Sequence, residues 1–155
     1  MSLSENMHNG EESDIRKVKN MKVPKIDLVI CNSRASNTGE LTGAAATEIV
    51  REYNDVGILS LPSLANGVAR QVAMAKEISH IIVIDGCKNS CAKKIADRLG
   101  LKYDTCLNLG EDLGIRKIGP FSTLRYLDSE VTKVKDAIKK LIEEIKGNSH
   151  MEGEK

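Results

Sequence analysis

The stretch Ile26-Asp27-Leu28-Val29-Ile30-Cys31 is an aliphatic run with one interruption, and it decides the fold class. A strand that is buried on both faces has nearly continuous apolar sequence, as in a parallel sheet. Further runs of this kind predict strands over 56–61, 80–84 and 101–107, and periodic apolar residues predict helices over 41–53, 64–79, 90–99 and 128–146. Because strands and helices alternate, we predict an α/β fold, a small Rossmann-like domain of three layers with a mainly parallel sheet of about four strands.

The composition of the chain divides its 155 residues into three parts. Residues 1–23 are polar and aperiodic and predict a disordered N-terminal arm, and 148–155 predict a disordered tail. Residues 24–147 then form a single α/β domain. An apolar signal segment and a membrane-spanning run are both missing, so we expect a cytoplasmic protein without a membrane partner. Lys and Arg total 23 against 22 Asp and Glu, which argues against a nucleic-acid partner.

Four cysteines fall at the ends of the predicted strands. Cys31 ends the first run, Cys87 and Cys91 follow the third, and Cys106 lies near the end of the fourth. The carboxyl ends of parallel strands form one edge, where ligands bind, so we expect these thiols to cluster there. In a reducing compartment, clustered cysteines indicate a metal site or thiol chemistry more often than disulfides.

Thiolates at this spacing suit a tetrahedral zinc ion. Cys87 and Cys91 are four residues apart at the start of a predicted helix, which places both on one face and favours their thiolate forms. An iron–sulfur cluster is an alternative for four thiolates. Another alternative is a thiol enzyme, redox or transferase, with Cys31 as nucleophile or Cys87 and Cys91 as a reversible pair, and a third is a metal or thiol sensor. Cys31 and Cys106 could also be small buried apolar residues.

The polar loop after the first strand offers a second group of candidate residues. Ser36, Asn37, Thr38 and Gly39 place donors at a predicted helix start, where a small anionic ligand would bind. A simple capping turn, with Thr38 as the N-cap, is the alternative. Low-molecular-weight tyrosine phosphatases need an arginine six residues after their nucleophile, and Asn37 at that position argues against phosphatase activity.

Two residues before Cys87 are expected to support its site. Asp85 could orient a ligand or accept backbone hydrogen bonds, and Gly86 lets the backbone turn sharply after the strand. His80 begins the same predicted strand, so it should lie away from the carboxyl edge. Histidine is therefore not expected among the ligands.

Taken together, these motifs resemble those of the DGC family, small prokaryotic proteins thought to bind zinc and named for an Asp-Gly-Cys motif. The motifs are Cys31-Asn32-Ser33, Ser36-Asn37-Thr38-Gly39, Asp85-Gly86-Cys87 and Cys91-Ala92-Lys93-Lys94. The resemblance covers about 25–107, and it implies a metal site carried by Cys31, Cys87, Cys91 and Cys106. Many members have another cysteine after the second strand, where this chain has Leu59-Ser60-Leu61-Pro62. The family has no established activity, so the resemblance implies a site and no particular reaction.

Overall fold

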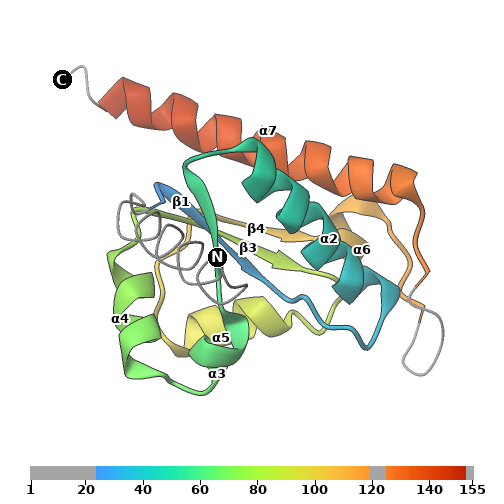
Figure 1. Cartoon of the computed structure of the whole chain (residues 1–155), viewed down its shortest axis with the longest axis horizontal. Helices are drawn as coiled ribbons and strands as arrows, with labels where there is room; N and C mark the ends of the chain where they lie inside the picture. Colours follow the sequence, from blue (N-terminus) through green and yellow to red (C-terminus); the bar gives the residue numbers. More distant parts are fainter. Residues whose placement is uncertain (1–23, 119–124, 153–155) are drawn as a thin grey trace, which may run out of the picture.

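The computed structural model describes residues 24–118 and 125–152. Its centre is a sheet of four parallel strands in the order β2-β1-β3-β4 (Figure 1). The strands are β1 (Ile26–Ile30), β2 (Val56–Leu59), β3 (His80–Asp85) and β4 (Thr105–Asn108). Every residue of β1 is buried, as its aliphatic sequence predicts. The predicted α/β fold with a parallel sheet is therefore confirmed.

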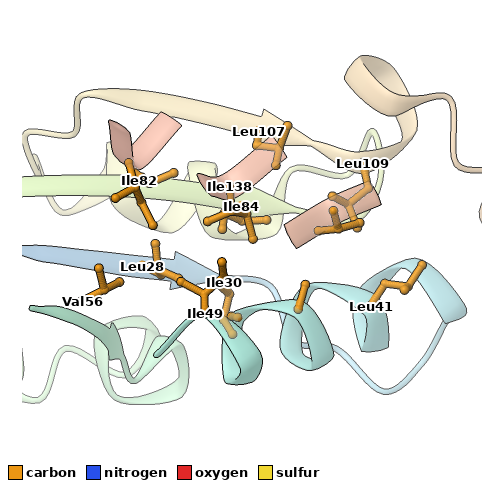
Figure 2. Packing of buried hydrophobic residues seen from close by; sticks show 14 of the residues in the cluster. Leu28, Ile30, Leu41, Ile49, Val56, Ile82, Ile84, Leu107, Leu109 and Ile138 are labelled. Carbon is orange, nitrogen blue, oxygen red and sulfur yellow. The ribbon is translucent and has the colours of Figure 1, made fainter. Parts of the chain in front are cut away.

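Helices cover both faces of the sheet and complete three layers (Figure 1). On one face lie α2 (Asn37–Glu52), α6 (Leu109–Leu113) and α7 (Asp128–Glu152), and on the other lie α3 (Leu61–Ala65), α4 (Ala69–Glu77) and α5 (Cys91–Arg98). Figure 2 shows the first core, where Ile30 and Ile84 of the sheet meet Ile49 of α2 and Ile138 of α7. Each such buried side chain stabilises the fold by about 1.5–3 kcal/mol relative to an exposed one.

The helix predicted over 64–79 is two helices, and the physical reason lies between them. Gly67 has a φ of +65°, a left-handed conformation that ends a helix. Ser60 starts the first of the two, α3, by accepting a hydrogen bond from the Ser63 N–H. The second strand therefore ends at Leu59, two residues earlier than predicted.

Other boundaries also differ from the prediction. The strand predicted over 101–107 forms only from Thr105 to Asn108. It is followed by α6, which was not predicted, and Asn108 caps this helix by accepting bonds from the Gly110 and Glu111 N–H groups. Helix α2 begins at Asn37 with Ser36 as N-cap, so the prediction of Thr38 as N-cap is wrong.

The last helix is longer than its sequence suggests. Helix α7 was predicted to end at Gly147, but it continues to Glu152, so a disordered tail is wrong for residues 148–152. The predicted arm over 1–23 and the rest of the tail, 153–155, lie outside the described residues. Among the helices that the structure describes, none is long and apolar enough to cross a membrane.

Candidate functional site

The strand order places two cysteine-bearing turns side by side. Strands β1 and β3 are neighbours in the sheet, while the chain visits β2 on the far side of β1 between them. The chain therefore leaves the carboxyl ends of β1 and β3 in opposite directions, and this kind of switch point forms the ligand crevice of open parallel sheets. Cys31 directly follows β1, and its N–H donates to the carbonyl of Ile84 at 2.9 Å. Cys87 lies two residues after the end of β3.

The turn after β3 lies against the start of α2. A side-chain Cβ at Gly86 would come within 2.7 Å of the carbonyl carbon and oxygen of Thr38 and within 2.8 Å of the Gly39 nitrogen. Only glycine allows two backbone segments to approach so closely. The Asp-Gly-Cys sequence thus sets the path of the chain from β3 to Cys87.

The polar loop before α2 uses its side chains within the protein. The Ser36 hydroxyl accepts a bond from the Gly39 N–H at 3.2 Å and caps the helix. Asn37 reaches the segment after α6, where its amide donates to the Arg116 carbonyl at 3.0 Å and its oxygen accepts from the Ile118 N–H at 2.6 Å. The Ser36 contact is a helix cap, and the Asn37 contacts join the start of α2 to the segment after α6.

Asp85 positions the helix that carries Cys91. Its buried carboxylate accepts hydrogen bonds from the Ala92 N–H at 2.8 Å and the Lys93 N–H at 2.9 Å, at the start of α5. Burial raises the pKa of Asp85, and these two bonds oppose that shift. Cys91, the first residue of α5, is exposed above this anchor. Of the two roles predicted for Asp85, the structure shows the acceptance of backbone hydrogen bonds.

Cys31 and Cys91 lie near each other. Cys31 is half-buried, and burial raises the pKa of its thiol, against the effect of a backbone hydrogen bond from Ser33. The nearby Asp85 carboxylate raises the same pKa further through its negative charge, and Cys91 also lies close enough to contribute. Without another ligand, Cys31 is therefore a protonated thiol at neutral pH.

Cys87 has a different environment from Cys31. The Lys117 ammonium nitrogen donates to the Cys87 sulfur at 3.7 Å, and the Asn108 amide donates to the Cys87 carbonyl at 2.9 Å. Cys87 lines a shallow cavity of about 280 Å³ beside α6, whereas Cys31 lines one of about 230 Å³ beside Pro62. Neither Asn108 nor Lys117 was predicted from sequence. Asn108 had a signal, since it is a strand-end asparagine two residues before a glycine, whereas Lys117 had none.

Cys106 differs from these three because it lies within a strand. It lies inside β4 opposite Val83, two residues before the strand ends, and packs in the core beneath α5 with Tyr103. Burial is the main cause that raises the pKa of its thiol. Cys106 is half-buried, and the Tyr103 hydroxyl and the charged groups of Lys93, Asp97 and Asp85 also influence its pKa.

Comparison with known families bears on the whole region. The family model of the DGC domain matches residues 28–143, well over half of the chain. The chain belongs to the DGC family. The match extends past residue 107, where the motif resemblance ended, and it includes α6 and most of α7. No curated protein and no solved structure matches the chain.

The cysteine thiols of this DGC domain are suitable ligands for a soft metal, but their side chains are not arranged around a common metal position. All four cysteines are free thiols. In the part of the chain that the structure describes, no three His, Cys, Asp or Glu side chains are arranged to hold a metal ion. A metal that used Cys31, Cys87 and Cys91 would therefore have to draw their side chains together.

Proposed function

We propose that this protein binds zinc at the carboxyl edge of the sheet through the thiolates of Cys31, Cys87 and Cys91. The observation that carries the proposal is the neighbouring position of β1 and β3, whose ends both lead into cysteine-bearing turns at the switch point. Membership of the DGC family is compatible with metal binding. Thiolates are soft ligands that select zinc over harder cations.

Cys31 and the start of α5 are fixed by hydrogen bonds, whereas the turn between Gly86 and Cys91 can change its conformation. Cys31 is held by the sheet through its bond to Ile84, and the start of α5 is held by Asp85. The segment between Gly86 and Cys91 includes Ser90 in a left-handed conformation, with a φ of 49°. We infer that this short turn rearranges on binding and brings the Cys87 sulfur toward Cys31 and Cys91. A zinc ion with three protein ligands keeps an open position, at which bound water or a substrate carbonyl can be polarised.

Charge compensation also supports the proposal. Three thiolates around a divalent cation leave one net negative charge. Lys117 already lies 3.7 Å from the Cys87 sulfur, so its ammonium group can offset that charge.

The test is the zinc content of cysteine variants purified without oxygen. We expect about one zinc per chain in the wild type and a large loss in Cys91→Ser, which removes a soft ligand while nearly keeping the side-chain size. Cys106→Ser is the matched control, since that residue is packed beneath α5, and it should keep its zinc. Metal-free wild-type protein, or an equal loss in both variants, would contradict the proposed ligand set.

A second candidate function, a thiol enzyme, is favoured by one observation. The contact with Lys117 makes Cys87 a better nucleophile candidate than Cys31, because burial raises the pKa of the Cys31 thiol. Cys87 and Cys91 would then act as a reversible pair. Reversible formation of a Cys87–Cys91 disulfide in wild-type protein that never carries metal, detected by mass spectrometry, would favour this function over zinc binding.

A further inference from the structure

A chain of three hydrogen-bonded side chains lies at the opposite, amino-terminal edge of the sheet. His80 is the first residue of β3, Asp104 immediately precedes β4, and Ser149 belongs to the last turns of α7, whose end lies over this edge (Figure 1). His80 Nδ1 lies 2.9 Å from Asp104 Oδ1, and His80 Nε2 lies 3.3 Å from the Ser149 hydroxyl oxygen. Residues from three separate parts of the chain thus form a hydrogen-bonded series of serine, histidine and aspartate.

The hydrogen bonds define which tautomer the neutral imidazole adopts. The Asp104 carboxylate can only accept, and it is held in place by the Ile81 N–H, which donates to its second oxygen at 2.9 Å. His80 Nδ1 must therefore carry the proton that is donated to Asp104. The lone pair is left on Nε2, which faces the Ser149 hydroxyl, and this is the tautomer that a general base needs. The Ser149–His80 separation is typical of the looser geometry of unliganded sites.

Solvent and a small molecule can reach these groups. The side chains of His80 and Asp104 are 31% and 33% exposed, and Ser149 is exposed as well. His80 and Ser149 line two adjoining cavities, of about 510 and 610 Å³. The first cavity also contains Leu141 and Ile145, which offer an apolar surface to a short acyl chain.

The end of α7 provides further support for acyl transfer. In the resting state the Ser149 hydroxyl also donates to the Ile145 carbonyl at 2.9 Å, so the proton can turn between that oxygen and His80. The Asn148 side chain lines the same cavity and makes no hydrogen bond to the residues that the structure describes, so its amide can donate to an oxyanion.

We propose that Ser149, His80 and Asp104 form a site that hydrolyses esters of short-chain carboxylic acids, separate from the cysteine site. The Ser149 oxygen attacks the ester carbonyl carbon while its proton passes to His80 Nε2. The bond from carbonyl carbon to alkoxy oxygen then breaks, and the alcohol leaves with that proton. Water gives a proton to His80 and adds to the acyl group; the bond to Ser149 breaks, the carboxylic acid departs, and the proton returns to Ser149.

The test uses the full chain with p-nitrophenyl acetate as the probe. We expect kcat to fall at least about 100-fold in Ser149→Ala and in His80→Gln, since general-base catalysis contributes about 10²–10⁴-fold. Ser129→Ala, an exposed serine in the first turn of α7, is the control and should keep the wild-type rate. Because alanine is a good helix former, Ser149→Ala should fold, and an unchanged melting temperature checks this.

Two further measurements test the roles of Ser149 and Asp104. A fluorophosphonate probe should add to Ser149 in the wild type, as located by peptide mass spectrometry, and not in His80→Gln. Asp104 acts as a positioning residue, so Asp104→Asn should lower kcat with KM unchanged. Equal hydrolysis by the wild type and Ser149→Ala, or a probe that labels cysteine or another serine instead, would overturn the proposal and would leave the zinc proposal unaffected.

Discussion

Replacing Asp27 by asparagine should stabilise the protein at neutral pH. Asp27 lies in β1, where the residue is 4% exposed and its carboxylate lies against Gly57. Within residues 24–118 and 125–152 its carboxylate accepts no hydrogen bond and forms no ion pair. Burial alone therefore raises the pKa of Asp27 from 3.8 to about 6. An ionised carboxylate in this position costs free energy that a neutral amide of the same shape does not.

The size and sign of the effect follow from the two pKa values. A shift from 3.8 to about 6 corresponds to about 3 kcal/mol, at 1.36 kcal/mol for each unit. Between these values the folded protein holds a proton that the unfolded chain has lost, so the free energy of unfolding falls as the pH rises. Below pH 4 this group costs little. Above pH 6 the full penalty is present, and Asp27→Asn removes it.

Thermal unfolding at pH 4 and pH 7 tests this reasoning. We expect Asp27→Asn to raise the melting temperature at pH 7 by roughly 6–12 °C, at about 2–4 °C per kcal/mol, and to change it little at pH 4. Asp136→Asn, an exposed carboxyl group on α7, is the matched control and should show no such dependence on pH. An Asp27→Asn gain that is equal at both pH values, or absent at pH 7, would show that burial of Asp27 does not destabilise the protein.

Three other substitutions or treatments give clear expectations. Gly86→Ala should lower the free energy of unfolding by about 1–3 kcal/mol, because the new methyl group would press on the Thr38 backbone; an unchanged urea midpoint would contradict this contact. Gly147→Ala should instead raise the free energy of unfolding by about 1 kcal/mol, since nothing lies within 4 Å and the position is inside a helix; a loss in the same urea titration would refute that. In metal-free protein, iodoacetamide should modify exposed Cys91 before half-buried Cys31, whose pKa burial raises, and mass spectrometry of the peptides would reveal the reverse order.

The parallel sheet could be predicted from sequence because strands buried on both faces leave an unmistakable aliphatic run, as in β1. Helix boundaries were less predictable where tertiary packing outweighs local preference. Gly147 costs α7 about 1 kcal/mol, but the helix continues past it to Ser149, whose hydroxyl bonds to the Ile145 carbonyl and contacts His80 of the sheet. Gly67 does end a helix, because there it takes a left-handed conformation that the sequence did not reveal.

Sequence could predict the cysteines of the candidate site that directly follow a strand, because the ends of the strands could be located. Cys31 and Cys87 follow strands whose ends could be located from sequence, and the structure places those ends side by side. Cys106 depends on the register of β4, which starts at Thr105 and so places this cysteine inside the strand. His80 and Ser149 come from distant parts of the chain, so no local sequence pattern could predict the contact between them.

X-ray absorption at the zinc edge of the loaded, full-length protein tests the central proposal most directly. The proposed site predicts three sulfur neighbours at about 2.3 Å, with Cys106→Ser giving the same spectrum as the wild type. A zinc ion surrounded only by nitrogen or oxygen at about 2.0–2.2 Å, or a sulfur count that falls in Cys106→Ser, would contradict the assignment of Cys31, Cys87 and Cys91 as the ligands.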